Sequence, residues 1–221
     1  RVWTPEELRK MNDICMKHGV KVVSDEIHCE LVMPGHKFTP FAAVSEECER
    51  NVVTLNSPSK SFNIAGLQIA NIICRNDEWR RRIDRIINIF EVCDVNPFGP
   101  AALEAAYNES EEWLDALNVY ISDNYRWLLE YFGREVPQLK VTSLEGTYLV
   151  WVDISATGLD STTLADRLLH DDHVMISAGT MYGQTTGRDF IRINIACPRK
   201  TMIEGLQRIA ATIKPLIAKT N

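Results

Sequence analysis

The sequence lacks a long apolar run, an excess of basic residues and any C-x-x-C cysteine pair. No stretch approaches the roughly 20 apolar residues that span a bilayer, and the polar N-terminus has no apolar core of the kind found in signal peptides. Because 24 Lys and Arg are outnumbered by 30 Asp and Glu, the net charge is −6. Nucleic-acid-binding proteins need a basic face, so we expect neither a nucleic-acid partner nor a membrane partner.

The six cysteines are scattered along the chain rather than clustered. A chain of 221 residues in which 45% are apolar can bury a core without disulfides. His18, His36, His170 and His173 show no metal-ligand spacing with cysteine or acidic residues. We therefore expect reduced thiols in a cytoplasmic protein, and no metal site.

The first part of the chain alternates helical and strand patterns, which favours an α/β fold. Thr4 followed by Pro-Glu-Glu is a helix-start signal, and Gly19 stands where that helix would end. A helical pattern also covers residues 77–94. Short β-branched or apolar runs predict strands over residues 20–23, 52–55 and 69–73.

The second part begins after the turn-forming segment Asn96-Pro97-Phe98-Gly99-Pro100. A long helical pattern then runs from residue 101 towards Phe132. Beyond it we expect a smaller α+β unit with strands over 140–142, 148–152 and 190–194 and helices over 161–170 and 202–218, the last turn disturbed by Pro215. We place the domain boundary near residue 132, with a large-domain portion over 1–99, a long interdomain helix over 100–132 and a small domain over 133–221.

Two polar stretches follow predicted strands. In open α/β sheets ligands bind at the carboxyl ends of strands, which makes Asp25 a candidate binding residue. A turn-capping Asp25 beside a solvated His28 explains the same stretch. Lys60 lies among small hydroxyl residues, where a half-buried lysine loses its proton readily for Schiff-base chemistry, and Ser57 and Ser59 are suited to bind an anion. An ordinary surface lysine is the alternative.

Taken together, three segments form a more specific pattern: Ser24–His28 (SDEIH), Ser57–Leu67 (SPSKSFNIAGL) and Phe190–Arg199 (FIRINIACPR). They resemble the pyridoxal-phosphate enzymes of fold type I, the aspartate aminotransferase superfamily, and within it the MalY/PatB-like cystathionine β-lyases. The resemblance covers essentially the whole chain. It implies the C-terminal part of the pyridoxal-phosphate-binding large domain of an aspartate aminotransferase-like α/β fold, followed by an α+β small domain.

The resemblance implies pyridoxal 5'-phosphate as the cofactor and a role for each matching residue. Lys60 would bind the cofactor as a Schiff base and then move the proton at the substrate α-carbon. Asp25 would pair with the pyridine nitrogen and keep it protonated. Ser57, with Ser59 as a second candidate, would bind the phosphate, and Arg192 would bind the substrate α-carboxylate.

Two positions depart from the wider superfamily. His28 stands where many members have a tyrosine, and Gln68 where many aminotransferases have a phosphate-binding arginine. Both departures resemble the lyase branch, which makes His28 a candidate cofactor contact and implies a carbon–sulfur β-lyase. Such an enzyme converts cystathionine- or cysteine-type substrates to thiol, pyruvate and ammonia. An aminotransferase of the same fold is the alternative, and a non-catalytic interaction or regulatory fragment is the alternative from another class.

Members of this family are much longer than this chain, and Arg1 falls just after their cofactor-contacting Asn-Pro segment. The resemblance therefore implies that the N-terminal half of the enzyme is missing here and that the chain alone is inactive. We expect the chain to expose sheet edges and an apolar face, and to associate with its N-terminal counterpart or with copies of itself. The full-length protein is expected to be a homodimer that acts on a small amino-acid substrate.

Overall fold

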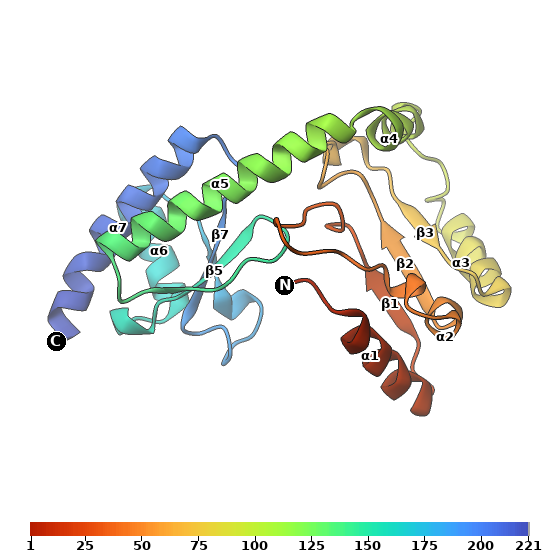
Figure 1. Ribbon diagram of the computed structural model, residues 1–221, viewed down its shortest axis with the longest axis horizontal. Coiled ribbons are helices and arrows are strands. Elements are labelled where there is room, and N and C mark those ends of the chain that lie inside the picture. The colour runs from red at the N-terminus through yellow and green to blue at the C-terminus, as the bar shows by residue number, and fades with distance from the viewer. Residues whose placement is uncertain (221) are drawn as a thin grey trace. The chain divides into compact units, whose positions relative to one another are not determined.

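The computed structural model describes the backbone of residues 1–220 and the side chains of residues 1–218 (Figure 1). The chain forms two compact units, and the division falls between Leu117 and Asn118. This division comes earlier than the boundary near residue 132 that the sequence suggests. The reason is that Ile121 and Leu128 are already buried within the second unit.

The first unit contains a three-stranded sheet and the helices around it. The strands, in spatial order, are β1 (Val22–Asp25), β2 (Val52–Asn56) and β3 (Asn71–Ile73). β1 and β2 are parallel, whereas β3 runs antiparallel to β2. The helices are α1 (Pro5–Lys17), α2 (Glu46–Arg50), α3 (Asp77–Ile89), α4 (Phe98–Glu109) and the 3-10 helices η1 (Phe41–Ala43) and η2 (Ala65–Leu67).

The predicted start of the first helix is confirmed in detail. Thr4 Oγ1 accepts the backbone N–H of Glu7, and the Glu7 carboxylate accepts the backbone N–H of Thr4, which together form a capping box. Gly19 has φ +66°, a conformation that suits glycine just past a helix end. The buried face of α1 contributes to a small core made of Leu8, Phe41, Cys48 and Val52.

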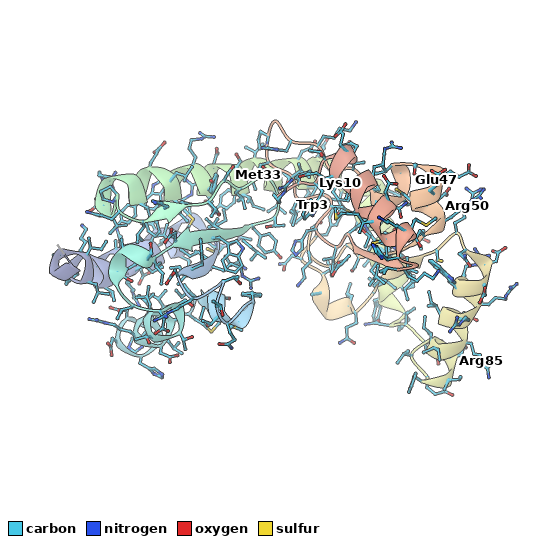
Figure 2. All side chains as sticks on the ribbon, turned by 90° about the horizontal axis from the view of Figure 1, so that it is seen from below. Trp3, Lys10, Met33, Glu47, Arg50 and Arg85 are labelled. Carbon is cyan, nitrogen blue, oxygen red and sulfur yellow. The ribbon has the colours of Figure 1, made fainter. Side chains whose placement is uncertain are left out.

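Much apolar surface of this unit is open to solvent. Val23 of β1 is 65% exposed and Ile73 of β3 is 57% exposed, although both are apolar strand residues. α3 buries none of its residues, so that Ile86 and Ile89 are exposed together with the charged Arg85 (Figure 2). The expected exposure of apolar sheet surface is therefore present in this chain.

The second unit packs helices against an antiparallel sheet. The strands β4 (Lys140–Val141), β5 (Leu149–Asp153), β6 (Ser177–Ala178) and β7 (Phe190–Asn194) lie in the order β4-β5-β7-β6. The helices are α5 (Glu111–Glu135), which begins before the division, α6 (Ser161–Asp172) and α7 (Arg199–Thr220), with the 3-10 helices η3 (Ser155–Thr157) and η4 (Gly179–Met181). Within residues 1–220, no helix is long and apolar enough to cross a membrane.

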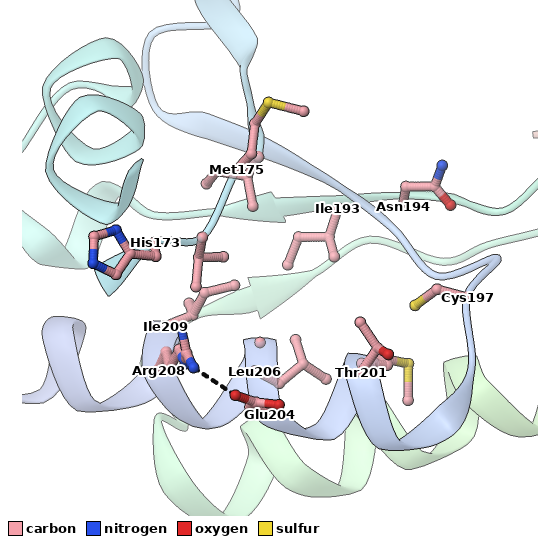
Figure 3. A pocket seen from close by; sticks show the side chains of 14 residues that line it. His173, Met175, Ile193, Asn194, Cys197, Thr201, Glu204, Leu206, Arg208 and Ile209 are labelled. Carbon is pink, nitrogen blue, oxygen red and sulfur yellow. Dashed lines mark hydrogen bonds and ion pairs between the residues drawn. The ribbon is translucent and has the colours of Figure 1, made fainter. Parts of the chain in front are cut away.

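The strands of this sheet alternate buried and half-buried residues. Val150, Val152, Ile191 and Ile193 are buried, and Ile193 faces α7 across the region drawn in Figure 3. Trp151 and Arg192, which are partners in the β5–β7 register, therefore point to the opposite face of the sheet. The helices complete the core with fully buried side chains, among them Leu128, Leu164, Leu168, Ile209 and Ile213.

Several elements differ from the sequence-based expectations. The single helix predicted from residue 101 to Phe132 is two helices, separated at Ser110, whose Oγ donates to the Ala105 backbone oxygen 3.1 Å away. Serine competes for backbone hydrogen bonds in this way and favours helix ends over helix interiors. Pro215 lies inside α7, and the helix continues past it. The short elements α2 and β6 have too few residues to show a periodic pattern.

Candidate functional site

The carboxyl ends of β1 and β2 lie together at one edge of the first sheet. Asp25 is the last residue of β1 and pairs in register with Leu55 of the parallel strand β2. Lys60 follows the end of β2 after one short turn. Because parallel neighbours end at the same edge, the loops that carry Asp25 and Lys60 leave the sheet side by side.

Asp25 and the next residue, Glu26, take opposite roles. Asp25 is exposed, and only its Oδ1 accepts a local bond, from the backbone N–H of Ile27 at 3.2 Å. Glu26 is buried, and its Oε1 accepts both the Ser24 hydroxyl and the Phe41 backbone N–H at 2.9 Å. Glu26 therefore ties the strand end to η1, while the carboxylate of Asp25 remains accessible to a ligand.

Lys60 is exposed on a tight turn held by backbone hydrogen bonds. The backbone N–H of Phe62 donates to the Pro58 oxygen at 2.9 Å, and that of Ile64 donates to the Ser59 oxygen at 3.2 Å. These bonds fix the backbone on both sides of Lys60 and leave its side chain outside the turn. The half-buried lysine considered from the sequence is thus an exposed one in this chain.

The two serines before Lys60 differ in accessibility. Ser57 is buried, and its hydroxyl donates to the Ile69 backbone oxygen at 2.6 Å and accepts the backbone N–H of Ser59 at 3.1 Å. The one proton of the Ser57 hydroxyl is therefore used in a hydrogen bond within the protein. To donate to a phosphate, the hydroxyl would have to break its bond to Ile69. Ser59 is half-buried. The phosphate-binding roles of Ser57 and Ser59 stay predictions.

His28 and Gln68 lie in the loops that follow this sheet edge. The backbone oxygen of His28 accepts the N–H of Leu31 at 3.0 Å, so that His28 belongs to the turn that begins after Asp25. Its imidazole is half-buried. Gln68 is exposed and has φ +51° at the end of η2. The cofactor contact expected of His28 stays a prediction.

A polar cluster that the sequence analysis did not single out lies behind Lys60. The hydroxyl of Ser61 donates to Glu30 Oε2 at 2.6 Å. Tyr107 Oη donates to Asn56 Oδ1 at 2.5 Å, and Asn56 Nδ2 donates to Cys29 Sγ at 3.2 Å. In the sequence, Ser61 directly follows the candidate lysine and Glu30 lies shortly after the candidate aspartate, which is the only hint of this cluster. Their hydrogen bond joins residues 31 positions apart, so no local pattern predicts it.

Arg192 belongs to the second unit and has an aromatic environment of its own. Its Cζ lies 4.4 Å from the centroid of the Tyr182 ring, and its Nη2 lies 3.4 Å from Ser177 Oγ, to which it donates. The Tyr182 ring meets Trp151 edge-on, with 5.4 Å between centroids. Burial raises the pKa of Tyr148, and the positive charge of Arg192 opposes that rise.

The guanidinium of Arg192 is available for an anion. Arg192 is half-buried. Among residues 1–218, no carboxylate forms an ion pair with its guanidinium. A guanidinium presents a planar fork of donors that matches a carboxylate. The arrangement in this unit is therefore suited to bind a small carboxylate.

A separate surface pocket of about 360 Å³ lies between β7 and α7 of the same unit (Figure 3). Its floor is apolar, with Ile193 and Leu206, and its rim carries the ion pair of Glu204 with Arg208, at 2.5 Å. None of the predicted site residues lines it. Within the part of the chain that the structure describes, no group of three His, Cys, Asp or Glu side chains is arranged to hold a metal ion.

The chain is similar to characterised proteins along nearly all of its length. It is 39% identical over 213 residues to cystathionine β-lyase PatB of Bacillus subtilis and 33% identical over 219 residues to protein MalY of Escherichia coli. These matches cover 96% and 97% of this chain but 55% and 54% of the relatives, so that the chain spans about half the length of the curated relatives it matches.

Solved structures agree with the fold expected from the sequence. Cystalysin from Treponema denticola, which contains pyridoxal 5'-phosphate, superposes with a TM-score of 0.93 at 34% identity, covering 98% of this chain and 55% of that one. The pyridoxal-phosphate-bound C–S lyase from Staphylococcus hominis gives a TM-score of 0.87 at 35% identity, covering 97% and 54%. The pyridoxal-phosphate transferase-like fold is therefore confirmed. Because the family described as aminotransferase class I and II matches residues 1–209, the chain belongs to that family.

Proposed function

We propose that this chain is part of a pyridoxal-phosphate-dependent carbon–sulfur β-lyase that acts on cystathionine- or cysteine-type amino acids. The observation that carries the proposal is the placement of an accessible carboxylate, Asp25, and an exposed amine, Lys60, in adjacent loops at the carboxyl edge of two parallel strands. The name of the Bacillus subtilis relative, cystathionine β-lyase PatB, supports the assignment as a lyase. So do His28 and Gln68, which depart from the usual aminotransferase residues.

The residues at this edge fit pyridoxal phosphate in their chemistry. A lysine amine reacts with aldehydes, and the exposed side chain of Lys60 would hold the cofactor covalently. The Asp25 carboxylate has an oxygen that the bond from Ile27 does not use, and it is suited to pair with a protonated pyridine nitrogen. When bound, the cofactor supplies an electron sink for negative charge at the substrate α-carbon.

The residues of this chain would then divide the work of β-elimination. After the substrate amine displaces it from the cofactor, the freed Lys60 Nζ would accept the proton from the substrate α-carbon as a general base. The Asp25 carboxylate would stabilise positive charge at the ring nitrogen. Arg192 binds the α-carboxylate with two parallel hydrogen bonds. The carbon–sulfur bond breaks, the sulfur leaves with its electron pair and takes up a proton as a thiol, and hydrolysis of the remaining carbon skeleton yields pyruvate and ammonia.

The experiment uses the whole protein that contains this chain, loaded with pyridoxal phosphate and supplied with cystathionine and no keto acid. Release of thiol and pyruvate in equal amounts is the expected result. An aminotransferase would instead require an added keto acid and would release no thiol. If the whole protein fails to bind pyridoxal phosphate, the chain belongs to a non-catalytic member of the family and the proposal is wrong.

We also propose that the whole protein is a cytoplasmic homodimer. The six cysteines are free thiols in the structure, which suits a reducing compartment. The apolar side chains exposed on β1, β3 and α3 provide surface for association, either with the N-terminal half or with a second chain. Light scattering of the whole protein would give twice the mass of one chain, and a monomer at micromolar concentration would contradict the dimer.

A further inference from the structure

The side chains that follow Lys60 are anchored, although Lys60 itself is exposed. Ser61 is fully buried, and its Oγ donates to Glu30 Oε2 at 2.6 Å. The ring of Phe62 stacks on Trp113, with 5.8 Å between centroids, and meets Tyr107 edge-on at 5.9 Å. The two residues after Lys60 therefore hold the turn in place: Ser61 through a hydrogen bond and Phe62 through aromatic packing.

The hydrogen bond of Ser61 ends in the loop that carries the other candidate site residues. Glu30 lies on the turn that begins at Asp25, which is closed by backbone bonds from Cys29 to Glu26 and from Leu31 to His28, both 3.0 Å. The contact between Ser61 and Glu30 thus joins the loop of Lys60 to the loop of Asp25. These two loops are otherwise separated by a long stretch of sequence.

The carboxylate of Glu30 acts electrostatically on two neighbouring groups at this junction. Burial, with the negative charge of the adjacent Glu30 carboxylate as the next largest cause, raises the pKa of the Cys29 thiol to about 12. Burial and the same carboxylate also raise the pKa of Tyr107. Both groups therefore remain neutral near pH 7, and the carboxylate of Glu30 accepts the hydroxyl of Ser61. A charged acceptor strengthens the hydrogen bond from Ser61.

We propose that Glu30 is a positioning residue for Lys60 and acts through Ser61. The inference rests on the proposed function, in which Lys60 and Asp25 must meet the same small cofactor at the same time. A displacement of about 1 Å between groups that hold one ligand can cost on the order of a hundredfold in rate. A direct hydrogen bond between the two loops limits such displacement.

The test compares Ser61→Ala and Glu30→Ala with a matched control in the whole protein. The control is Ser161→Ala, because Ser161 is also fully buried and its hydroxyl also donates one hydrogen bond, to the Gly187 backbone oxygen at 3.1 Å. Ser161 lies in the other unit. A fourth variant, Glu30→Gln, keeps an oxygen that can accept from Ser61.

Two readouts are independent of turnover. In the cofactor-free protein, amide hydrogen exchange over residues 57–64 should accelerate in Ser61→Ala and Glu30→Ala but not in Ser161→Ala. After addition of pyridoxal phosphate, borohydride reduction and mass spectrometry give the rate at which Lys60 is modified. That rate should fall on the order of tenfold in Ser61→Ala and Glu30→Ala. Glu30→Gln should retain most of it, and Ser161→Ala should match the native protein.

The outcomes separate this proposal from the proposed function. If the native protein modifies Lys60 and all four variants do so at the native rate, the link between Glu30 and Lys60 is wrong and the proposed function stands. An equal loss in Ser161→Ala would also overturn the link, because general destabilisation would explain it. If Lys60 of the native protein takes up no pyridoxal phosphate, the proposed function fails and the link fails with it.

Discussion

The guanidinium carbon of Arg192 lies 4.4 Å from the centre of the Tyr182 ring, and the ring itself rests edge-on against Trp151. A cation over an aromatic face is attracted by the ring's negative charge distribution. The contact leaves the guanidinium edge free to bind an anion, while the ring and Ser177 restrict where that edge points. Substrate binding by Arg192 should therefore depend on Tyr182.

We predict that Tyr182→Leu weakens substrate binding in the whole protein. Cation–π contacts at exposed sites are worth about 0.5–1 kcal/mol, which corresponds to a roughly two- to fivefold increase in KM. Tyr182→Phe keeps the ring and should remain near the native KM. Steady-state kinetics with the preferred substrate measures the effect. An equal loss in both variants would show that the hydroxyl, rather than the ring, is needed.

Lys60→Ala should abolish covalent attachment of pyridoxal phosphate and all turnover, because it removes the amine to which the proposed function assigns both tasks. Mass spectrometry after borohydride reduction detects the attachment directly. The control is Lys37→Ala, which removes another exposed lysine of the same unit and should leave attachment intact. Full activity of Lys60→Ala would falsify the assignment of Lys60.

The core of the second unit offers a stability test with neighbouring leucines of α6. Leu168 is fully buried, whereas Leu169 is 42% exposed. Leu168→Ala should lower the free energy of unfolding by about 2–5 kcal/mol, because it removes buried methyl groups and leaves a cavity. Leu169→Ala should cost less than about 1 kcal/mol. Urea denaturation followed by circular dichroism gives both values, and similar losses would contradict the observed packing of α6.

The N-terminus of α6 predicts a pH-dependent contribution to stability. Asp160 Oδ1 accepts the backbone N–H groups of Thr163 at 3.0 Å and of Thr162 at 3.1 Å, and the bond from Thr163 is the main cause that lowers the pKa of Asp160. A lowered carboxyl pKa stabilises the folded state at pH values above the ordinary value of 3.8, and this stabilisation is lost as the pH falls through the folded-state pKa.

Asp160→Ala should therefore lower the melting temperature at pH 7, and the difference from the native protein should shrink as the pH falls below 3.8 and through the folded-state pKa. Asp166→Ala, at an exposed position of the same helix, is the control and should show no such pH dependence. A constant difference across this pH range would mean that the charge of Asp160 does not contribute.

The chain of 221 residues studied by itself should self-associate. Val23 and Ile73 expose apolar side chains on the sheet, and α3 exposes more. Such surface favours association in water. Light scattering over a range of concentrations should give a mass above 25.1 kDa. The variant Ile73→Lys should shift the mass towards that of a monomer, and a native chain that is monodisperse at high concentration would contradict the prediction.

Local patterns in the sequence were sufficient for most elements, and the sequence also indicated the candidate site residues. The capping box at Thr4 uses residues three apart, and β2 and β7 follow from short β-branched runs, so that neighbouring residues determine them. Asp25, Lys60 and Arg192 were identified because their segments resemble a family. Composition or periodicity alone left a turn-capping aspartate and a surface lysine as alternatives.

Only the tertiary structure decided which polar groups are accessible. In the folded chain Asp25 is exposed, whereas the next residue, Glu26, is buried. The hydroxyl of Ser57 donates a hydrogen bond to the backbone oxygen of Ile69. The tertiary structure also pairs Ser61 with Glu30 across 31 positions. The physical reason is that each of these hydrogen bonds joins one loop to another, and the meeting of those loops depends on how β1, β2 and β3 align rather than on any local preference of the residues.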